Sequence, residues 1–524
     1  MKSYLKHLES TLAPGEAAST VRKPVFRSAA IFPVLHGPEI TTRISFLGYW
    51  LLKRHIPEVR LVYTLRDQRG AILSRHSLLI DKVMAFDIDV EALLPSPAAS
   101  NFIGSIELEV FSTRDLVFPY PAFVLTYHGA GFSTSVHTTG RIYNDAEDWA
   151  DNEEVAVPES GFDVYPGDHY EPFVAFTNGP LVNATPRIFY TLVNAAGLTQ
   201  DGDVSLPKLG PYETVFLHLK QHVNLSFLGA HRGTIKLRHN FSGFFPRFIA
   251  GTFERQRAAS ITHTYYDCSL LTRDQDYWER RDARYYDSAV LIPLFAAEPF
   301  YTELVLYPVF SPSTFTLSIV FLDADGRALG EASPVRQVNA SDVVFQHLDL
   351  ASVARENGVP IERAFGANVI AEWASGSRIP TRLKLGLNVG IRGRALTLPS
   401  NICFAPQIGN PNVAQKAGTF RWAPLVNVGN SMLIVTNGSP LKQYVRPANL
   451  VMKFFRGADE TFLQRTATIP PNGQFRIDLQ ADPELSDFLE GRTGWVAVEA
   501  DNPFVNGWYF DFNESGAVGG DHVF

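Results

Sequence analysis

Four segments of the chain each begin with a glycine and continue as an alternating strand: Gly104-Ser-Ile-Glu-Leu-Glu-Val, Gly233-Thr-Ile-Lys-Leu-Arg-His, Gly366-Ala-Asn-Val-Ile-Ala-Glu and Gly494-Trp-Val-Ala-Val-Glu-Ala. These glycines are 129, 133 and 128 residues apart. A phenylalanine upstream of each glycine keeps nearly the same period, with spacings of 130, 129 and 130, at Phe86, Phe216, Phe345 and Phe475. Two markers that share one period over three intervals predict four copies of one unit.

Each copy repeats the same order of elements. An apolar strand ends in a turn that contains Gly70, Gly197, Gly326 or Gly457, and in two copies this turn has the pattern Asp-x-x-Gly, which predicts a hairpin. A short helical or irregular link, such as residues 348–355, precedes the strand that begins with glycine. Six or seven short strands in about 100 residues are typical of an antiparallel β-sandwich. No helical segments of 10–15 residues separate the strands, which argues against a parallel α/β fold.

The sequence therefore predicts an all-β protein of four tandem sandwich domains, immunoglobulin-like or similar. We place them at residues 24–145, 160–268, 288–404 and 420–524, between linkers that are acidic, of mixed charge or polar. Residues 1–23 are expected to form a helix or tail, because Tyr4, Leu5, Leu8 and Leu12 lie on one helical face. This helix would dock on the protein or, alternatively, bind a partner.

Composition narrows the classes of function. The 524 residues carry a net charge of −8, and 45% are hydrophobic. An acidic balance argues against nucleic acid as the main partner. No apolar stretch is long enough for a membrane-spanning helix, and no signal peptide is evident. We therefore expect a cytoplasmic protein by default, with an exported mature form as the alternative. Two cysteines, Cys268 and Cys403, exclude a disulfide framework and a cysteine-based metal site.

The best candidate site follows from the repeat. In three units an aromatic residue precedes a histidine by ten positions: Tyr127 and His137, Phe253 and His263, Phe512 and His522. The same alignment places Leu387 and Thr397 in the third unit. Nearby residues of the first two units complete the candidate binding set, which is Tyr127, His137, Tyr143, Asp145, His263, Tyr265, Asp267 and His522.

Three interpretations of these histidines are open. The preferred one is structural, with each histidine hydrogen-bonding the backbone at the end of the last strand. A second is sugar binding beside tyrosine. A third is a divalent metal, although only two ligands per unit can be named and a site needs three or four. No motif of a nucleophilic hydrolase, a zinc protease or a nucleotide-binding loop is present.

For the acidic linker and the tryptophans, the sequence favours a structural role over ligand binding. The acidic linker at residues 145–154 lacks the spacing of a calcium loop. Four tryptophans near linkers or terminal strands are expected to pack between successive domains, with sugar stacking as the alternative: Trp149, Trp278, Trp422 and Trp508.

The sequence thus favours a non-catalytic structural, assembly or adhesive protein without a cofactor. It would be an arm of four domains that binds a protein partner or copies of itself. One alternative is a carbohydrate-binding or carbohydrate-acting protein that uses the tyrosine, histidine and aspartate set. Another is a metal-dependent enzyme with a divalent metal in an interdomain cleft.

Overall fold

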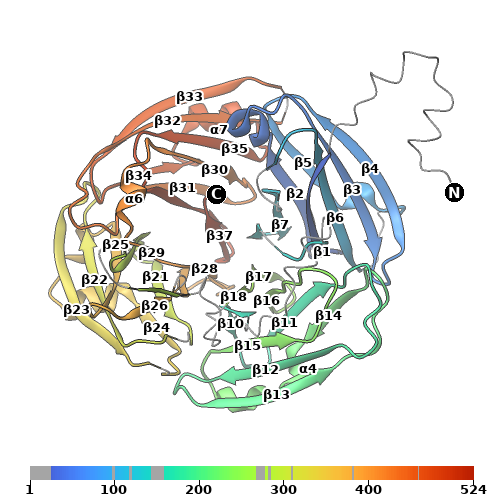
Figure 1. Cartoon of the computed structure of the whole chain (residues 1–524), viewed down its shortest axis with the longest axis horizontal. Coiled ribbons are helices and arrows are strands. Elements are labelled where there is room, and N and C mark those ends of the chain that lie inside the picture. The colour runs from blue at the N-terminus through green and yellow to red at the C-terminus, as the bar shows by residue number, and fades with distance from the viewer. Residues whose placement is uncertain are drawn as a thin grey trace, which may run out of the picture.

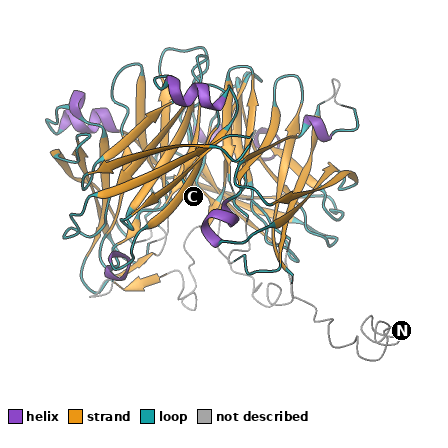
Figure 2. Ribbon diagram, turned by 90° about the horizontal axis from the view of Figure 1, so that it is seen from above, coloured by secondary structure: helices purple, strands orange, loops and turns teal. Residues whose placement is uncertain are grey.

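The protein is built almost entirely from antiparallel β-sheets that together form a closed ring (Figure 1). The computed structural model describes residues 25–96, 101–116, 121–137, 139–142, 159–266, 278–280, 285–308, 311–340, 342–380, 383–457 and 459–524. Strands make up the body of the ring, and the helices are short (Figure 2). The predicted all-β class is therefore confirmed. The N-terminal helix expected within residues 1–23 lies outside the described residues.

The elements fall into four successive sets, which we call units one to four. Unit one contains β1 (Phe26–His36), β2 (Thr41–Leu47), α2 (Tyr49–Arg54), β3 (Val59–Asp67), β4 (Ile72–Ile80), β5 (Ala85–Asp89), η2 (Glu91–Leu93), β6 (Phe102–Ser112), β7 (Val124–Gly129) and β8 (Phe132–Val136). Unit two contains β9 (Glu159–Ser160), β10 (Asp163–Val164), β11 (Tyr170–Thr177), β12 (Arg187–Val193), β13 (Thr199–Ser205), β14 (Thr214–His218), α4 (Leu219–His222), η3 (Leu225–Leu228), β15 (Gly233–His239), β16 (Ile249–Glu254), β17 (Ala258–His263) and β18 (Tyr265–Tyr266).

The second half of the chain repeats this order. Unit three contains β19 (Trp278–Arg280), β20 (Ser288–Pro293), β21 (Phe300–Leu306), β22 (Phe315–Leu322), β23 (Ala328–Val338), β24 (Gln346–Asp349), α5 (Leu350–Glu356), η5 (Ile361–Arg363), β25 (Gly366–Trp373), β26 (Arg378–Pro380), β27 (Leu385–Ile391), β28 (Ile402–Phe404) and β29 (Gln407–Ile408). Unit four contains α6 (Pro411–Ala414), β30 (Thr419–Leu425), β31 (Asn430–Asn437), β32 (Ala448–Phe455), β33 (Phe462–Ile469), β34 (Gln474–Asp478), α7 (Pro483–Leu489), β35 (Gly494–Ala500), β36 (Val505–Phe512) and β37 (Val518–His522).

Every unit has the same topology of two sheets. In unit one the first sheet has the strand order β1-β6-β3-β4 and the second β5-β2-β7-β8. The equivalent first sheets are β20-β25-β22-β23 and β30-β35-β32-β33, and the equivalent second sheets are β14-β11-β16-β17, β24-β21-β27-β28 and β34-β31-β36-β37. In unit two, β13-β12-β15 is extended by β9, β10 and β18. The chain thus passes repeatedly between two sheets, and the repeat found in the sequence recurs as a repeat of topology.

The hairpin turns use the same side-chain contact in three units. The side-chain oxygen of Asp67 accepts hydrogen bonds from the amides of Arg69 and Ala71 at 3.0 and 2.8 Å. Asn194 and Asp323 each accept from the amides two and four residues further on, at 2.9–3.0 Å. Asp and Asn form such turns readily because their short side chains reach the local backbone. The predicted hairpins are confirmed.

The four marker glycines lie at or near the start of corresponding strands, and their backbone conformation is not what requires glycine. Gly233, Gly366 and Gly494 begin β15, β25 and β35, and Gly104 is the third residue of β6. None of the four has a positive φ. A Cβ at Gly104 would instead lie 2.2 Å from the Arg66 carbonyl oxygen, on the neighbouring strand. Close approach to the adjacent strand therefore requires glycine there.

The sheets are arranged radially, like the blades of a propeller (Figure 1). β4, β13, β23 and β33 lie at the perimeter, and β17, β28 and β37 lie near the axis. The first sheet of one unit packs on the second sheet of the next, as β1 on β11 and β20 on β31. Central strands such as β27 are consequently buried on both faces, whereas perimeter strands such as β33 alternate between exposed and partly buried residues.

Aromatic side chains close the ring between units four and one. Trp422 of β30 stacks on Tyr49 of α2, with ring centroids 4.8 Å apart, and the Ala85 amide donates to the Arg456 carbonyl at 3.2 Å. Between units four and three, the indole N–H of Trp508 donates to the Leu291 carbonyl at 3.3 Å. Both tryptophans are buried, as the packing interpretation expected. Trp149 lies outside the described residues.

Within the described ranges, no helix has both the length and the apolar character needed to cross a bilayer.

Candidate functional site

The innermost strands of three units meet at the axis of the ring. The Thr134 hydroxyl on β8 donates to the Ile261 carbonyl on β17 at 2.8 Å and accepts from the Ile261 amide at 3.0 Å. On its other side, β8 approaches β37 so closely that a Cβ at Gly519 would lie 2.2 Å from the Ser133 carbonyl oxygen. Strands that are far apart in the sequence are therefore in direct contact here.

This contact brings together the three histidines singled out from the repeat. His137 directly follows β8, and His263 and His522 are the last residues of β17 and β37. The His137 ring lies 4.5 Å from the His263 ring and 4.6 Å from the His522 ring, measured between centroids. Asp521 precedes His522 and joins them. We call His137, His263, Asp521 and His522 the axial cluster.

Asp521 is the acidic centre of the axial cluster. Its Oδ2 accepts a hydrogen bond from His137 Nδ1 at 2.6 Å, and its Oδ1 accepts one from the His522 amide at 2.8 Å. The side chain of Asp521 is only 8% exposed. A buried carboxylate that accepts two hydrogen bonds is held in one orientation.

Two of the imidazoles are oriented in the same way. His263 Nδ1 donates to the Thr264 carbonyl at 2.8 Å, and His522 Nδ1 donates to the Val523 carbonyl at 3.0 Å. A carbonyl oxygen only accepts, so each neutral ring carries its proton on Nδ1 and leaves the Nε2 lone pair available. Among the described residues, neither Nε2 atom has a hydrogen-bond partner within normal distance.

Burial and neighbouring charges set the ionisation of the axial cluster. Burial raises the pKa of Asp521, but the hydrogen-bonded His137, together with the protonated forms of His522 and His263, outweighs burial and lowers this pKa to about 2. Burial, assisted by His137 and Arg247, holds the pKa of His263 well below its usual value. Burial also lowers the pKa of His522. The cluster thus combines an ionised carboxylate with neutral imidazoles at His263 and His522.

These groups are chemically suited to a cation. One potential ligand atom from each of His137, His263 and Asp521 lies within 4.8 Å of the other two. Imidazole nitrogen and carboxylate oxygen are ligands for zinc and similar divalent ions. The described residues of this cluster do not include a serine or cysteine nucleophile paired with a base.

Of the described residues that remain in the predicted binding set, Tyr127 lies away from the axial cluster and Tyr265 lies beside it. Tyr127 is fully buried in unit one, where its hydroxyl donates to the Pro33 carbonyl at 2.6 Å. The Tyr265 ring lies beside His263, with centroids 5.5 Å apart. Tyr143, Asp145 and Asp267 lie outside the described residues. Asp521, which adjoins His522 in the sequence, is the carboxylate that the binding set omitted.

The alignment of Thr397 with the histidines is wrong. Thr397 lies in the loop between β27 and β28, where its amide and hydroxyl both donate to the Glu254 carboxylate, at 2.7 and 3.1 Å. The innermost strand of unit three, β28, consists of Ile402, Cys403 and Phe404. The loop before β28 is longer than its counterparts, so a fixed spacing of ten residues stops before the strand. Unit three therefore contributes no histidine from β28.

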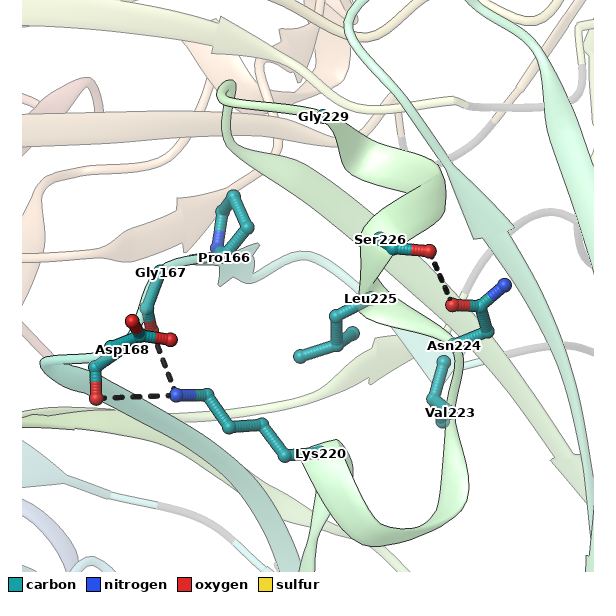
Figure 3. Close-up of a pocket in the computed structure, with 9 residues that line it drawn as sticks. All are labelled: Pro166, Gly167, Asp168, Lys220, Val223, Asn224, Leu225, Ser226 and Gly229. Atoms are coloured by element: carbon teal, nitrogen blue, oxygen red, sulfur yellow. Dashed lines mark hydrogen bonds between the residues drawn. The ribbon is translucent and has the colours of Figure 1, made fainter.

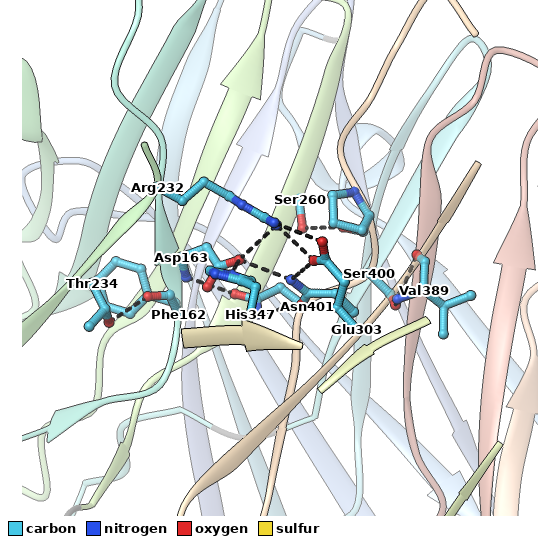
Figure 4. Close-up of polar contacts among 12 residues, drawn as sticks. Phe162, Asp163, Arg232, Thr234, Ser260, Glu303, His347, Val389, Ser400 and Asn401 are labelled. Carbon is cyan, nitrogen blue, oxygen red and sulfur yellow. Dashed lines mark hydrogen bonds and ion pairs between the residues drawn. The ribbon is translucent and has the colours of Figure 1, made fainter. Parts of the chain in front are cut away.

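A second polar cluster, missed from the sequence, joins units two and three (Figure 4). Asp163 accepts hydrogen bonds from His347 Nε2 at 2.9 Å, from Asn388 at 2.9 Å and from the Tyr307 hydroxyl at 3.2 Å. Arg232 lies 3.5 Å from Asp163 and forms a bidentate pair with Glu303 at 2.9 and 3.0 Å. We call these residues the Asp163 network.

The Asp163 network is an interface and not an open site. Asp163 is 3% exposed. Burial raises its pKa, but His347, Arg232 and Asn388 outweigh burial and lower the pKa to about 2. Because its oxygens are already engaged by donors from both units, the network binds the units to each other.

A surface pocket of about 440 Å³ lies in unit two (Figure 3). Its basic group, Lys220 Nζ, donates to the carbonyls of Gly167 at 2.7 Å and Asp168 at 3.4 Å. The Ser226 hydroxyl donates to Asn224 at 2.6 Å. These polar groups are bonded to their own walls, so we assign no chemistry to the pocket.

No protein-family model matches this chain, and a search of curated proteins finds no significant relative.

Proposed function

We propose that the protein is a non-catalytic structural or assembly protein whose single chain forms a closed, four-unit ring for binding other proteins. The observation that carries this proposal is that the polar side chains at the axis form hydrogen bonds between units. His137 bonds to Asp521 of unit four, Thr134 to Ile261 of unit two and Ser133 to Asp511 of unit four. These contacts join one unit to another.

Ring closure changes the kind of assembly to expect. The contact from one unit to the next is head-to-tail, and four copies close it, because unit four contacts unit one through Trp422 and Tyr49. A closed head-to-tail arrangement has no unpaired end for further copies. We therefore expect a compact ring to which other proteins bind, and not an extended arm that polymerises end to end. Its partners would bind the perimeter or the two faces.

The carbohydrate alternative receives less support. It relied on Tyr127 as a stacking or hydrogen-bonding group, but this side chain is fully buried and its hydroxyl is bonded to Pro33. Trp422 and Trp508 are likewise covered by neighbouring units.

The proposal is tested by opening the ring. Trp422→Ala removes the aromatic contact between units four and one, so complementary ends become exposed. We expect wild-type protein to remain monomeric across a wide concentration range in analytical ultracentrifugation, and the variant to form dimers and larger species as concentration rises. Trp373→Ala is the matched control, because Trp373 is equally buried but packs on Phe315 within unit three. It should lower stability without causing association.

Two results would overturn the proposal. End-to-end polymers of wild-type protein would contradict closure. Turnover of ester, phosphate or glycoside substrates by wild-type protein, abolished in His263→Gln, would contradict a non-catalytic role.

A further inference from the structure

The axial cluster presents more ligand groups than the joining of units requires. His137 Nδ1 lies 2.6 Å from Asp521 Oδ2, which places one imidazole nitrogen beside the carboxylate. His263 and His522 each present Nε2, because their Nδ1 atoms are bonded to backbone carbonyls. Three imidazole nitrogens and one carboxylate therefore come together at one point of the ring.

The hydrogen bonds behind these rings have the form found around protein-bound metals. A histidine that binds a metal commonly donates its other ring N–H to a backbone carbonyl or a carboxylate, which fixes both the tautomer and the ring orientation. His263 and His522 donate Nδ1–H to backbone carbonyls, so the second contacts of these two rings are already formed.

We propose that His137, His263 and Asp521 bind one divalent transition-metal ion, with Zn²⁺ the best match, at the axis of the ring. His522 is close enough to supply a fourth ligand, because its ring lies 4.6 Å from that of His137 and its Nε2 lies 3.9 Å from Asp521 Oδ1. Nitrogen donors favour zinc over calcium or magnesium, which prefer oxygen ligands.

The proposed coordination requires only small movements. Ligand atoms about 2.0–2.2 Å from a tetrahedral zinc lie roughly 3.3 Å from one another. Those of His137, His263 and Asp521 are within 4.8 Å, so side-chain rotation would close the site. His137 would bind the ion through Nδ1, the atom that now lies 2.6 Å from Asp521 Oδ2, so that the ion takes the place of the proton in this hydrogen bond. The most exposed member of the cluster is His522, whose side chain is 26% exposed, and it offers the entry route.

The ion would act as a clamp between units. Its ligands come from the ends of β8, β17 and β37, so units one, two and four would be joined by a single centre. A ligand that binds only the closed ring stabilises that state. Metal binding is therefore expected to raise the melting temperature as well as to load the site. This inference goes beyond the structural role proposed above, which stands without a metal.

The experiment uses untagged full-length protein, stripped with a chelator and dialysed. We expect it to bind one Zn²⁺ per chain in a competition titration with a chromophoric chelator, and its melting temperature to rise by a few degrees. Co²⁺ should give the intense visible absorption of a tetrahedral site. His263→Gln and Asp521→Asn should each weaken zinc binding by about 100-fold or more. His231→Gln, at an exposed histidine away from the axis, is the matched control and should bind as wild type.

Folding of the variants is checked separately by circular dichroism, and His137→Gln gives a third test, because this side chain is less buried than His263. Failure of wild-type protein to bind zinc, cobalt or nickel with a stoichiometry near one would overturn the proposal. Unchanged affinity in folded His137→Gln or Asp521→Asn protein would also overturn it, because the ion would then lie elsewhere.

Discussion

At the residue scale, two buried carboxylates, Asp163 and Asp521, each depend on hydrogen-bond donors from a neighbouring unit. Asp163 and Asp521 are each covered by donors from a neighbouring unit, and in both cases those donors hold the pKa of the carboxyl at about 2 although burial opposes this. A buried carboxylate without such donors would cost several kcal/mol. These two residues therefore select the arrangement of units that supplies their partners.

Acid should destabilise the protein in part through Asp163. Its pKa is about 2 in the folded protein and near 3.8 in the unfolded chain, so the unfolded chain binds more protons between these values. The free energy of unfolding should therefore fall as the pH drops from about 4 to 2, by about 2 kcal/mol from this group. Denaturant titrations at several pH values should show a shallower fall for Asp163→Asn. Equal slopes for the two proteins would contradict this assignment.

At the element scale, the hairpin turn of each first sheet also serves as a contact with the next unit. The Gln68 carbonyl accepts from the Thr214 amide at the start of β14, and the Ala324 carbonyl accepts from the Gln474 amide at the start of β34. The Arg456 carbonyl and the Ala85 amide at the start of β5 repeat this contact across the closing interface. One local turn, repeated, therefore places successive units.

The side chain of Asp323 should stabilise both the turn and the interface it makes. Asp323→Ala removes two hydrogen bonds to backbone amides, and we expect a loss of about 1–2 kcal/mol in the free energy of unfolding. Hydrogen exchange at the amides of Asp325 and Arg327 should accelerate. Asp323→Asn is the matched control, because Asn194 makes the same contacts in unit two, and it should be within about 0.5 kcal/mol of wild type. A loss in Asp323→Asn equal to that in Asp323→Ala would contradict this role.

At the scale of the whole molecule, the sheets pack on both faces, so the hydrophobic core is continuous between units. One cluster of buried side chains joins unit one to Phe173 and Ile249 of unit two and to Trp422 and Trp495 of unit four. A second cluster joins unit three to Ile434 and Trp508 of unit four. An interface between units is therefore built like the interior of a unit.

This continuity predicts cooperative unfolding. We expect differential scanning calorimetry to show one dominant transition instead of four independent ones, because exposing one unit also uncovers the core of its neighbours. Trp422→Ala should shift this transition to lower temperature as a whole. Several well-separated transitions in wild-type protein would show that the units are independent domains.

Local sequence determined the repeat, the antiparallel strands and the turn chemistry, because alternation and Asx turns depend on residues a few positions apart. It also singled out His137, His263 and His522, since each follows an aromatic residue by ten positions. Only the tertiary structure decided that these histidines meet and that Asp521 is their carboxylate: His137 and Asp521 are 384 positions apart, and no local pattern records such a contact. The Asp163 network and the position of Thr397 were likewise decided by the tertiary structure. Ring closure sets which units touch, and loop length shifts a strand without changing its own pattern.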